Sequence, residues 1–197
     1  NLLVISENRK RLRKKKKKSK IFNKKISSVI LESLEFKLTS DQINTINEIE
    51  NDLKSKNKMF RILQGDVGSG KTIVSLISIA NTCEAGYQCA LMAPTEILAS
   101  QHYFLAKKIF KNLNIKIELL TSKMDNKRRK EIINLIENKK IDFLIGTHSL
   151  FQEKVKFKKL GLIIIDEQHK FGVRQRMKLA EKGGVNCDVL LMSATPI

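Results

Sequence analysis

Residues 65–72 read Gly65-Asp66-Val67-Gly68-Ser69-Gly70-Lys71-Thr72, which satisfies the pattern Gly-x-x-x-x-Gly-Lys-Ser/Thr. A short apolar run precedes this stretch, and a segment with apolar residues at helical spacing follows it. A strand, a glycine-rich turn and a helix in that order surround an anion with backbone N–H groups and the positive end of a helix dipole. The stretch therefore predicts a phosphate-binding loop.

The residue types in this loop predict a nucleoside triphosphate rather than a simple anion. Lys71 should reach the β- and γ-phosphates, and the Thr72 hydroxyl should bind Mg²⁺. A glycine-rich turn that arose by chance is the alternative, and the flanking strand and helix patterns argue against it. We expect every residue from Gly65 to Thr72 to contact the nucleotide.

A second motif follows the uninterrupted apolar run 162–165, which is typical of a central parallel strand buried on both faces. The run ends in Asp166-Glu167-Gln168-His169. Asp166 is placed to hold Mg²⁺ opposite the phosphate loop, and Glu167 to orient or deprotonate the attacking water. Acidic residues can also simply cap a strand at the surface, but together with the phosphate loop they indicate a nucleoside triphosphatase.

Short apolar runs alternate with amphipathic stretches along the rest of the chain, which predicts crossover units and a mainly parallel sheet flanked by helices. Residues 21–52 also have apolar residues at helical spacing, and Thr39-Ser40-Asp41 is the expected cap region within this stretch. The expected strands are 60–63, 89–92, 115–120, 143–145, 162–165 and 189–192. The expected helices between them are 71–83, 96–110 and 127–137. The predicted fold class is an α/β P-loop domain, and ligands of such sheets bind at the carboxyl ends of the strands.

The chain of 197 residues is strongly basic, with a formal net charge of +18. Such an excess predicts a polyanionic partner, either nucleic acid or an anionic membrane surface. Ten of the twelve residues from 9 to 20 are Lys or Arg, so we assign 1–20 to a basic linker or the end of a preceding domain. The run is equally compatible with a solubilising tail and with sequence-independent phosphate contact. Residues 21–197 form the predicted main domain.

Composition argues against several other classes of protein. No stretch is long and apolar enough to span a bilayer, and the N-terminus lacks a cleavage-site pattern. Three cysteines and three histidines have no metal-like spacing, so we expect reduced thiols in a cytoplasmic protein without membrane contact. The sequence starts without Met and stops just after Ser-Ala-Thr-Pro, which we interpret as a fragment of a longer protein.

The acidic motif resembles that of superfamily 2 helicases, whose motors have two RecA-like domains. Other segments resemble helicase motifs in the same order along the chain. Residues 36–42 resemble the adenine-recognition segment, 93–96 and 146–150 resemble DNA-contacting motifs, and 193–195 resemble the motif that links hydrolysis to movement.

Within the superfamily, three segments are similar to RecG-type DNA helicases, namely 64–72, 92–99 and 166–173. The transcription-repair coupling factor is the nearest relative, with Phe where Ser69 stands and Glu where Gln168 stands. Both positions therefore favour RecG. Lys170 departs from the usual Arg of the family, and 121–123 lacks the usual Gly after its Thr.

The resemblance implies a role for each motif residue, with ATP and Mg²⁺ as cofactors. The implied catalytic residues are Lys71, Asp166, Glu167, Gln168 and His169. Gln42 would recognise adenine beside the phosphate-loop residues Gly65, Asp66, Val67, Gly68, Ser69, Gly70, Lys71 and Thr72. Contacts to DNA are implied for Pro94, Thr95, Gly146, Thr147 and His148, and coupling for Ser193, Ala194 and Thr195.

The implied function is ATP-driven remodelling of forks and junctions in recombination and repair. Residues 21–197 are the implied first RecA-like ATP-binding domain. Branched DNA, a second RecA-like domain and a wedge domain are the implied partners. One alternative is a translocase like the transcription-repair coupling factor. Another is an ATP- and DNA-binding fragment without turnover of its own, because the arginine fingers come from the second domain. An RNA helicase and a basic polyanion-binding module with a vestigial ATP fold are the remaining alternatives.

Overall fold

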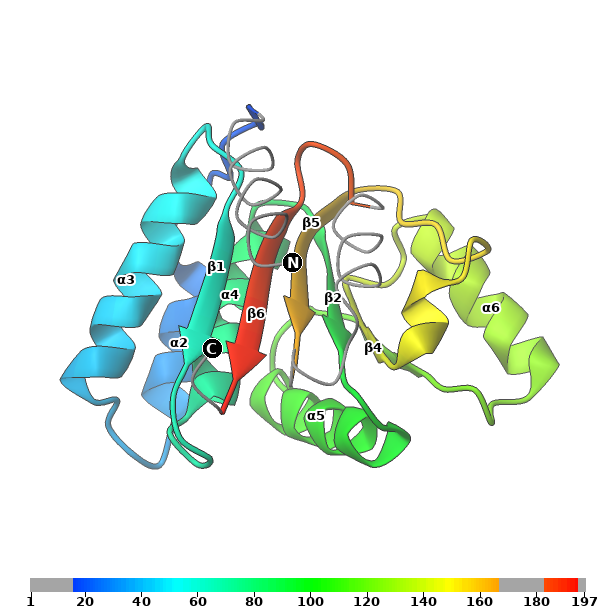
Figure 1. Ribbon diagram of the computed structural model, residues 1–197, viewed down its shortest axis with the longest axis horizontal. Helices are drawn as coiled ribbons and strands as arrows, with labels where there is room; N and C mark the ends of the chain where they lie inside the picture. The colour runs from blue at the N-terminus through cyan, green and yellow to red at the C-terminus, as the bar shows by residue number, and fades with distance from the viewer. Residues whose placement is uncertain (1–15, 167–182, 195–197) are drawn as a thin grey trace, which may run out of the picture.

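The structure of the protein, a computed structural model, describes residues 16–166 and 183–194 (Figure 1). Its centre is a six-stranded sheet in the order β1-β6-β5-β2-β4-β3, in which every neighbouring pair is parallel. The strands are β1 (Phe60–Gln64), β2 (Gln88–Met92), β3 (Ile117–Leu120), β4 (Phe143–Gly146), β5 (Leu160–Ile165) and β6 (Asp188–Ser193). The predicted parallel α/β fold is therefore confirmed.

Helices cover both faces of this sheet, and the described strands are therefore buried on both sides. The edge strand β1 is the least completely buried. Cys89 and Leu91 pack into one hydrophobic cluster, and Ala90 and Met92 pack into the other. The first cluster lies under α2 (Lys25–Ser33), α3 (Ser40–Lys54), α4 (Lys71–Glu84) and α5 (Glu96–Ile109). The second lies under α6 (Asn126–Glu137) and the short 3-10 helix η1 (His148–Phe151).

The helical stretch expected from 21 to 52 is two helices, α2 and α3, separated by 34–39. The second helix starts at the expected cap region, where Thr39 and Gln42 form a capping box. The other expected elements agree with the structure to within one or two residues at each end. The strand expected from residue 115 begins at Ile117, since the Ile115 N–H bonds to the nearby Leu113 carbonyl in a turn.

The basic segment before α2 differs from expectation. Lys17 and Lys20 are buried, and their ammonium groups lie 2.5 and 2.6 Å from Oδ2 of Asp188 at the start of β6. Burial lowers the pKa of Lys17, against the attraction of the Asp188 carboxylate. The interpretation of a solvated run is therefore wrong for these two lysines, because a buried carboxylate compensates them. Residues 16–20 lie against this domain, while the predicted boundary at residue 20 stays a prediction.

The described part of the chain also bears on membrane contact. None of its helices is both long and apolar enough to cross a bilayer.

Candidate nucleotide and nucleic-acid site

The phosphate loop joins the end of β1 to the start of α4, as the sequence pattern predicts. Gly68 and Gly70 have φ angles of 83° and 81°, a left-handed backbone conformation that residues other than glycine adopt only at an energetic cost. The Lys71 ammonium lies inside the turn, 2.6 Å from the Gly65 carbonyl and 2.7 Å from that of Asp66. The loop thus encloses a positive charge at the N-terminus of a helix, the arrangement that binds phosphates.

Gln42 lies directly against this loop. Its Nε2 donates to the Ser69 carbonyl at 2.9 Å, and its Oε1 accepts from the Thr39 N–H at 2.9 Å. A Cβ atom at Gly70 would come within 2.2 Å of Nε2, so glycine is needed for this approach. Both ends of the Gln42 amide are engaged, which links the start of α3 to the phosphate loop.

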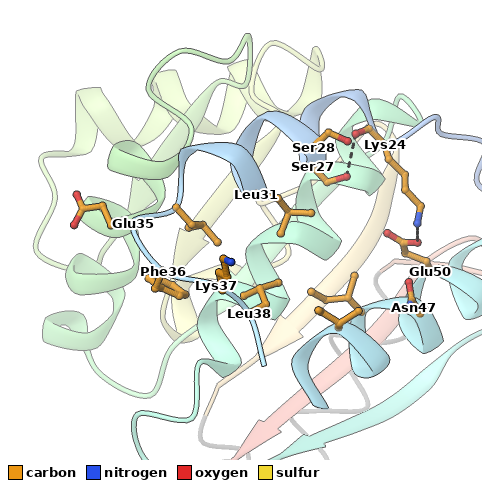
Figure 2. A pocket seen from close by; sticks show the side chains of 13 residues that line it. Lys24, Ser27, Ser28, Leu31, Glu35, Phe36, Lys37, Leu38, Asn47 and Glu50 are labelled. Atoms are coloured by element: carbon orange, nitrogen blue, oxygen red, sulfur yellow. Dashed lines mark hydrogen bonds and ion pairs between the residues drawn. The ribbon is translucent and has the colours of Figure 1, made fainter. Parts of the chain in front are cut away.

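A groove of about 710 Å³ lies between α2 and α3, and the segment expected to recognise adenine forms part of its wall (Figure 2). Phe36, Lys37 and Leu38 line it from the connection between the helices, and Phe36 is 55% exposed. Lys24 and Glu50 form an ion pair of 2.5 Å at its other end. None of its lining residues belongs to 65–72, so the groove is not part of the phosphate loop.

Asp166 follows β5, and β6 separates that strand from β1. Since neighbouring strands are ~4.8 Å apart, the ends of β1 and β5 lie about 10 Å apart. The Gly65 N–H donates to the Ser193 carbonyl at 3.3 Å, which joins the phosphate loop to the end of β6. The loop, Ser193 and Asp166 therefore share one edge of the sheet.

The donor set at this edge is compatible with Mg²⁺. The described residues contain no cluster of three or more His, Cys, Asp or Glu that could hold a metal ion. Magnesium seldom needs such a cluster, because it takes one or two carboxylates and completes its shell with phosphates and water. The half-buried Thr72 and Asp166 are oxygen donors of the required kind. Both stay candidates for a nucleotide-bound ion.

One residue at this edge was not expected from the sequence. His102 of α5 has its Nε2 2.7 Å from Oδ2 of Asp166, and the two side chains are 11% and 13% exposed. Helical spacing could have placed His102 toward the sheet, because Ala99 and Ala106 on the same face are buried. That Asp166 is the partner of His102 depends on the order of the strands in the sheet, which helical spacing in the sequence does not reveal.

The two segments expected to contact DNA adjoin each other at the same edge. The Ala93 N–H donates to the Gly146 carbonyl at 2.9 Å. Thr95 is exposed, and its hydroxyl caps α5 by accepting from the Leu98 N–H at 3.3 Å. The other candidates vary in exposure, with Pro94 half-buried, Thr147 buried and His148 exposed.

Gly146 and residues 121–123 complete this edge. A Cβ atom at Gly146 would lie 2.6 Å from the Leu120 carbonyl oxygen, so this close approach of two strands requires glycine. Ser122 donates to Glu96 through its hydroxyl and its N–H, and these hydrogen bonds hold the pKa of the Glu96 carboxyl below its ordinary value. Residues 121–123 are thereby tied to the first turn of α5.

The coupling motif is only partly within the described residues. Ser193 is buried and pairs in register with Gln64, and Ala194 is half-buried. The remaining predicted site residues, Glu167, Gln168, His169 and Thr195, lie outside the described residues.

The parallel sheet and its glycine-rich loop define a P-loop domain of the RecA-like type. A family model described as DEAD/DEAH box helicase matches residues 39–197. The chain belongs to the DEAD/DEAH box helicase family.

Individual relatives narrow the resemblance. The chain is 46% identical over 200 residues to the ATP-dependent DNA helicase RecG of Thermotoga maritima, covering 100% of this chain and 26% of the relative. It is 50% identical over 167 residues to the Bacillus subtilis RecG, covering 85% and 24%. The predicted RecG-type resemblance is confirmed. The chain spans about a quarter of the length of these curated relatives.

Solved structures agree with the fold. A structure of RecG bound to a three-way DNA junction superposes with a TM-score of 0.88 at 43% identity, covering 99% of this chain and 26% of that one. The DEAD-box helicase Mss116 bound to single-stranded RNA and UDP-BeF superposes with a TM-score of 0.71 at 22% identity, covering 90% and 39%. The second likeness supports the fold alone.

Proposed function

We propose that the chain is the first motor domain of an ATP-dependent DNA helicase that remodels forks and junctions in recombination and repair. The observation that carries the proposal is the meeting of the phosphate loop, Asp166 and Ser193 at one sheet edge. The 46–50% identity to RecG helicases supports this over a transcription-repair coupling factor. The proposal carries with it the cytoplasmic location expected from the sequence.

In this function the loop residues 65–72 bind the triphosphate of ATP, and Lys71 neutralises its charge. Gln42 recognises adenine from its place beside Ser69. Thr72 and Asp166 hold Mg²⁺, which when bound neutralises charge on the phosphates. Glu167 orients the attacking water, and Gln168 and His169 sense the nucleotide. Ser193, Ala194 and Thr195 relay that state.

We assign DNA contact to Pro94, Thr95, Gly146, Thr147 and His148, through backbone N–H groups and hydroxyls to phosphates. The segments 93–96 and 146–150 are adjacent through the Ala93–Gly146 hydrogen bond, which supports one continuous path for a DNA strand. The buried Thr147 would contribute its backbone rather than its hydroxyl. A second RecA-like domain and a wedge domain would complete the machine.

The test is a Lys71→Ala variant of the full-length protein. DNA-stimulated ATPase should be abolished, because the variant removes the ammonium group that lies inside the loop, within 2.7 Å of the Gly65 and Asp66 carbonyls. Lys158→Ala is the matched control, since that lysine is exposed before β5 at the opposite edge. Undiminished turnover in the Lys71 variant would refute the assigned role.

The runner-up is a nucleotide- and DNA-binding module without turnover of its own. An arginine finger contributes ~10³–10⁵ in rate, and the resemblance places that residue in the second domain. Single-turnover ATPase of the separate domain at the full helicase rate would exclude this alternative. Stimulation by forked DNA, single-stranded DNA and RNA, measured side by side on the full-length protein, separates DNA from RNA helicase activity.

A further inference from the structure

The contact between His102 and Asp166 joins a helix to the acidic end of a central strand. Nε2 of His102 lies 2.7 Å from Oδ2 of Asp166, and an ionised carboxylate can only accept, so the imidazole is the donor. The Asp166 backbone is fixed separately, because its N–H donates to the Met92 carbonyl at 2.8 Å. With its backbone held by the sheet, the side chain of Asp166 takes its orientation in part from the histidine.

The helix that carries His102 also carries one of the proposed DNA contacts. Thr95 caps the N-terminus of α5, and His102 follows seven residues later, about 10 Å along the axis. Ala99 and Ala106 are buried on the face that carries His102, whereas the neighbouring Gln101 is exposed. A shift of this helix at its exposed N-terminus would therefore move the imidazole against Asp166.

Resting on the proposed function, in which Asp166 holds Mg²⁺ and Thr95 touches DNA, we propose that His102 is a positioning residue for Asp166. It orients the carboxylate for the metal ion and links that orientation to the DNA-facing end of α5. Carboxylates that bind metal ions are held by outer hydrogen-bond partners, and the loss of such a partner lowers metal affinity ~10–100-fold.

The experiment measures the Mg²⁺ concentration at which the full-length protein half-saturates with a fluorescent, non-hydrolysable ATP analogue. His102→Ala should raise this concentration ~10–100-fold. His102→Gln should stay near the wild type, because its Nε2 supplies an N–H donor at a similar reach. Gln101→Ala is the control from the same helix and should leave the Mg²⁺ requirement unchanged.

The link to DNA is tested by repeating the titration with forked DNA. DNA should lower the Mg²⁺ requirement of the wild type and of His102→Gln, and should lose this effect in His102→Ala. A histidine that only stabilises the fold would leave the DNA effect unchanged. An equal DNA effect in all three proteins would therefore overturn the link.

An Asp166→Asn variant separates this inference from the proposed function. A raised Mg²⁺ requirement in Asp166→Asn with a wild-type requirement in His102→Ala overturns the role of His102 alone. A wild-type requirement in Asp166→Asn overturns the metal role of Asp166 and the inference with it. If His102→Gln is as impaired as His102→Ala, hydrogen-bond donation is not the cause and the positioning role is also overturned.

Discussion

The Nε2 atom of Gln42 donates a hydrogen bond to the carbonyl of Ser69 across a 2.9 Å distance. A residue at the start of α3 thus holds the phosphate loop from outside. The same amide closes the capping box through Oε1, so α3 and the loop are positioned together. Any group that draws Gln42 away from Ser69 also releases a constraint on the loop.

Two substitutions at Gln42 should separate its hydrogen bond to Ser69 from its part in the capping box. Gln42→Glu keeps the acceptor for the Thr39 N–H and loses the donor to Ser69, because capping boxes accept Glu at this position. The Glu variant should bind ATP several-fold more weakly, since one hydrogen bond contributes about 0.5–1.5 kcal/mol. The KM values for ATP and GTP in the full-length ATPase are the measurement.

Gln42→Ala is the companion variant, since it also removes the capping contact. Loss of that hydrogen bond should cost about 0.5–1.5 kcal/mol of helix stability in addition, visible as faster hydrogen exchange in the first turn of α3. Equal KM values for ATP and GTP in the wild type would contradict adenine recognition by this residue.

Asp188→Asn should strongly destabilise the end of the sheet opposite the nucleotide edge. It leaves two buried ammonium groups without a counter-charge, and breaking a buried ion pair in this way costs about 3–5 kcal/mol. The amide retains an oxygen for the Met59 N–H, which Asp188 accepts at 2.7 Å through Oδ1. Native-state hydrogen exchange of β6 amides in the full-length protein measures the loss.

Lys17→Met is the matched variant, because it leaves Lys20 paired with Asp188 one to one. Burial lowers the pKa of Lys17, so its charged form is less favourable in the fold than in the unfolded chain. The loss of β6 protection in Lys17→Met should therefore be smaller than in Asp188→Asn. The reverse order would show that the excess buried charge is not the controlling factor.

The sequence predicted the elements that local patterns determine. The Gly-Lys-Thr loop and the run 162–165 specify their own conformations, because glycine positions and an all-apolar strand leave few alternatives. The burial of Lys17 and the pairing of His102 with Asp166 were missed for a shared reason. Each depends on a partner far away in the chain that only the strand order brings near.

The three cysteines should differ in reactivity in the native protein. Burial raises the pKa of Cys187 to about 12 and raises that of Cys89 well above its ordinary value, so both remain thiols at neutral pH. Cys83 is partly exposed, 3.8 Å from the Cys89 sulfur. Brief alkylation at pH 8 followed by peptide mass mapping should label Cys83 and spare the other two until the protein unfolds. Rapid native labelling of Cys187 would contradict its burial.

The basic run at residues 9–20 is interpreted either as a phosphate contact or as a solubilising tail, and the salt dependence of DNA binding can distinguish the two. DNA affinity of the full-length protein should fall with salt at a log–log slope of about −0.9 per duplex phosphate neutralised. Lys17 and Lys20 are kept, because their ammonium groups are buried on Asp188 and unavailable to phosphates. The substitution to Gln is made at Arg9, Lys10, Arg11, Arg13, Lys14 and Lys15.

If those six cations touch phosphates, each lost contact should make the slope shallower by about 0.9 and weaken affinity uniformly across DNA sequences. A solubilising tail predicts an unchanged slope with poorer solubility. Fluorescence anisotropy at four or more salt concentrations, on forked and on linear duplex DNA, distinguishes the two. A salt-independent affinity of the wild type would contradict the phosphate contacts that the net charge of +18 predicts.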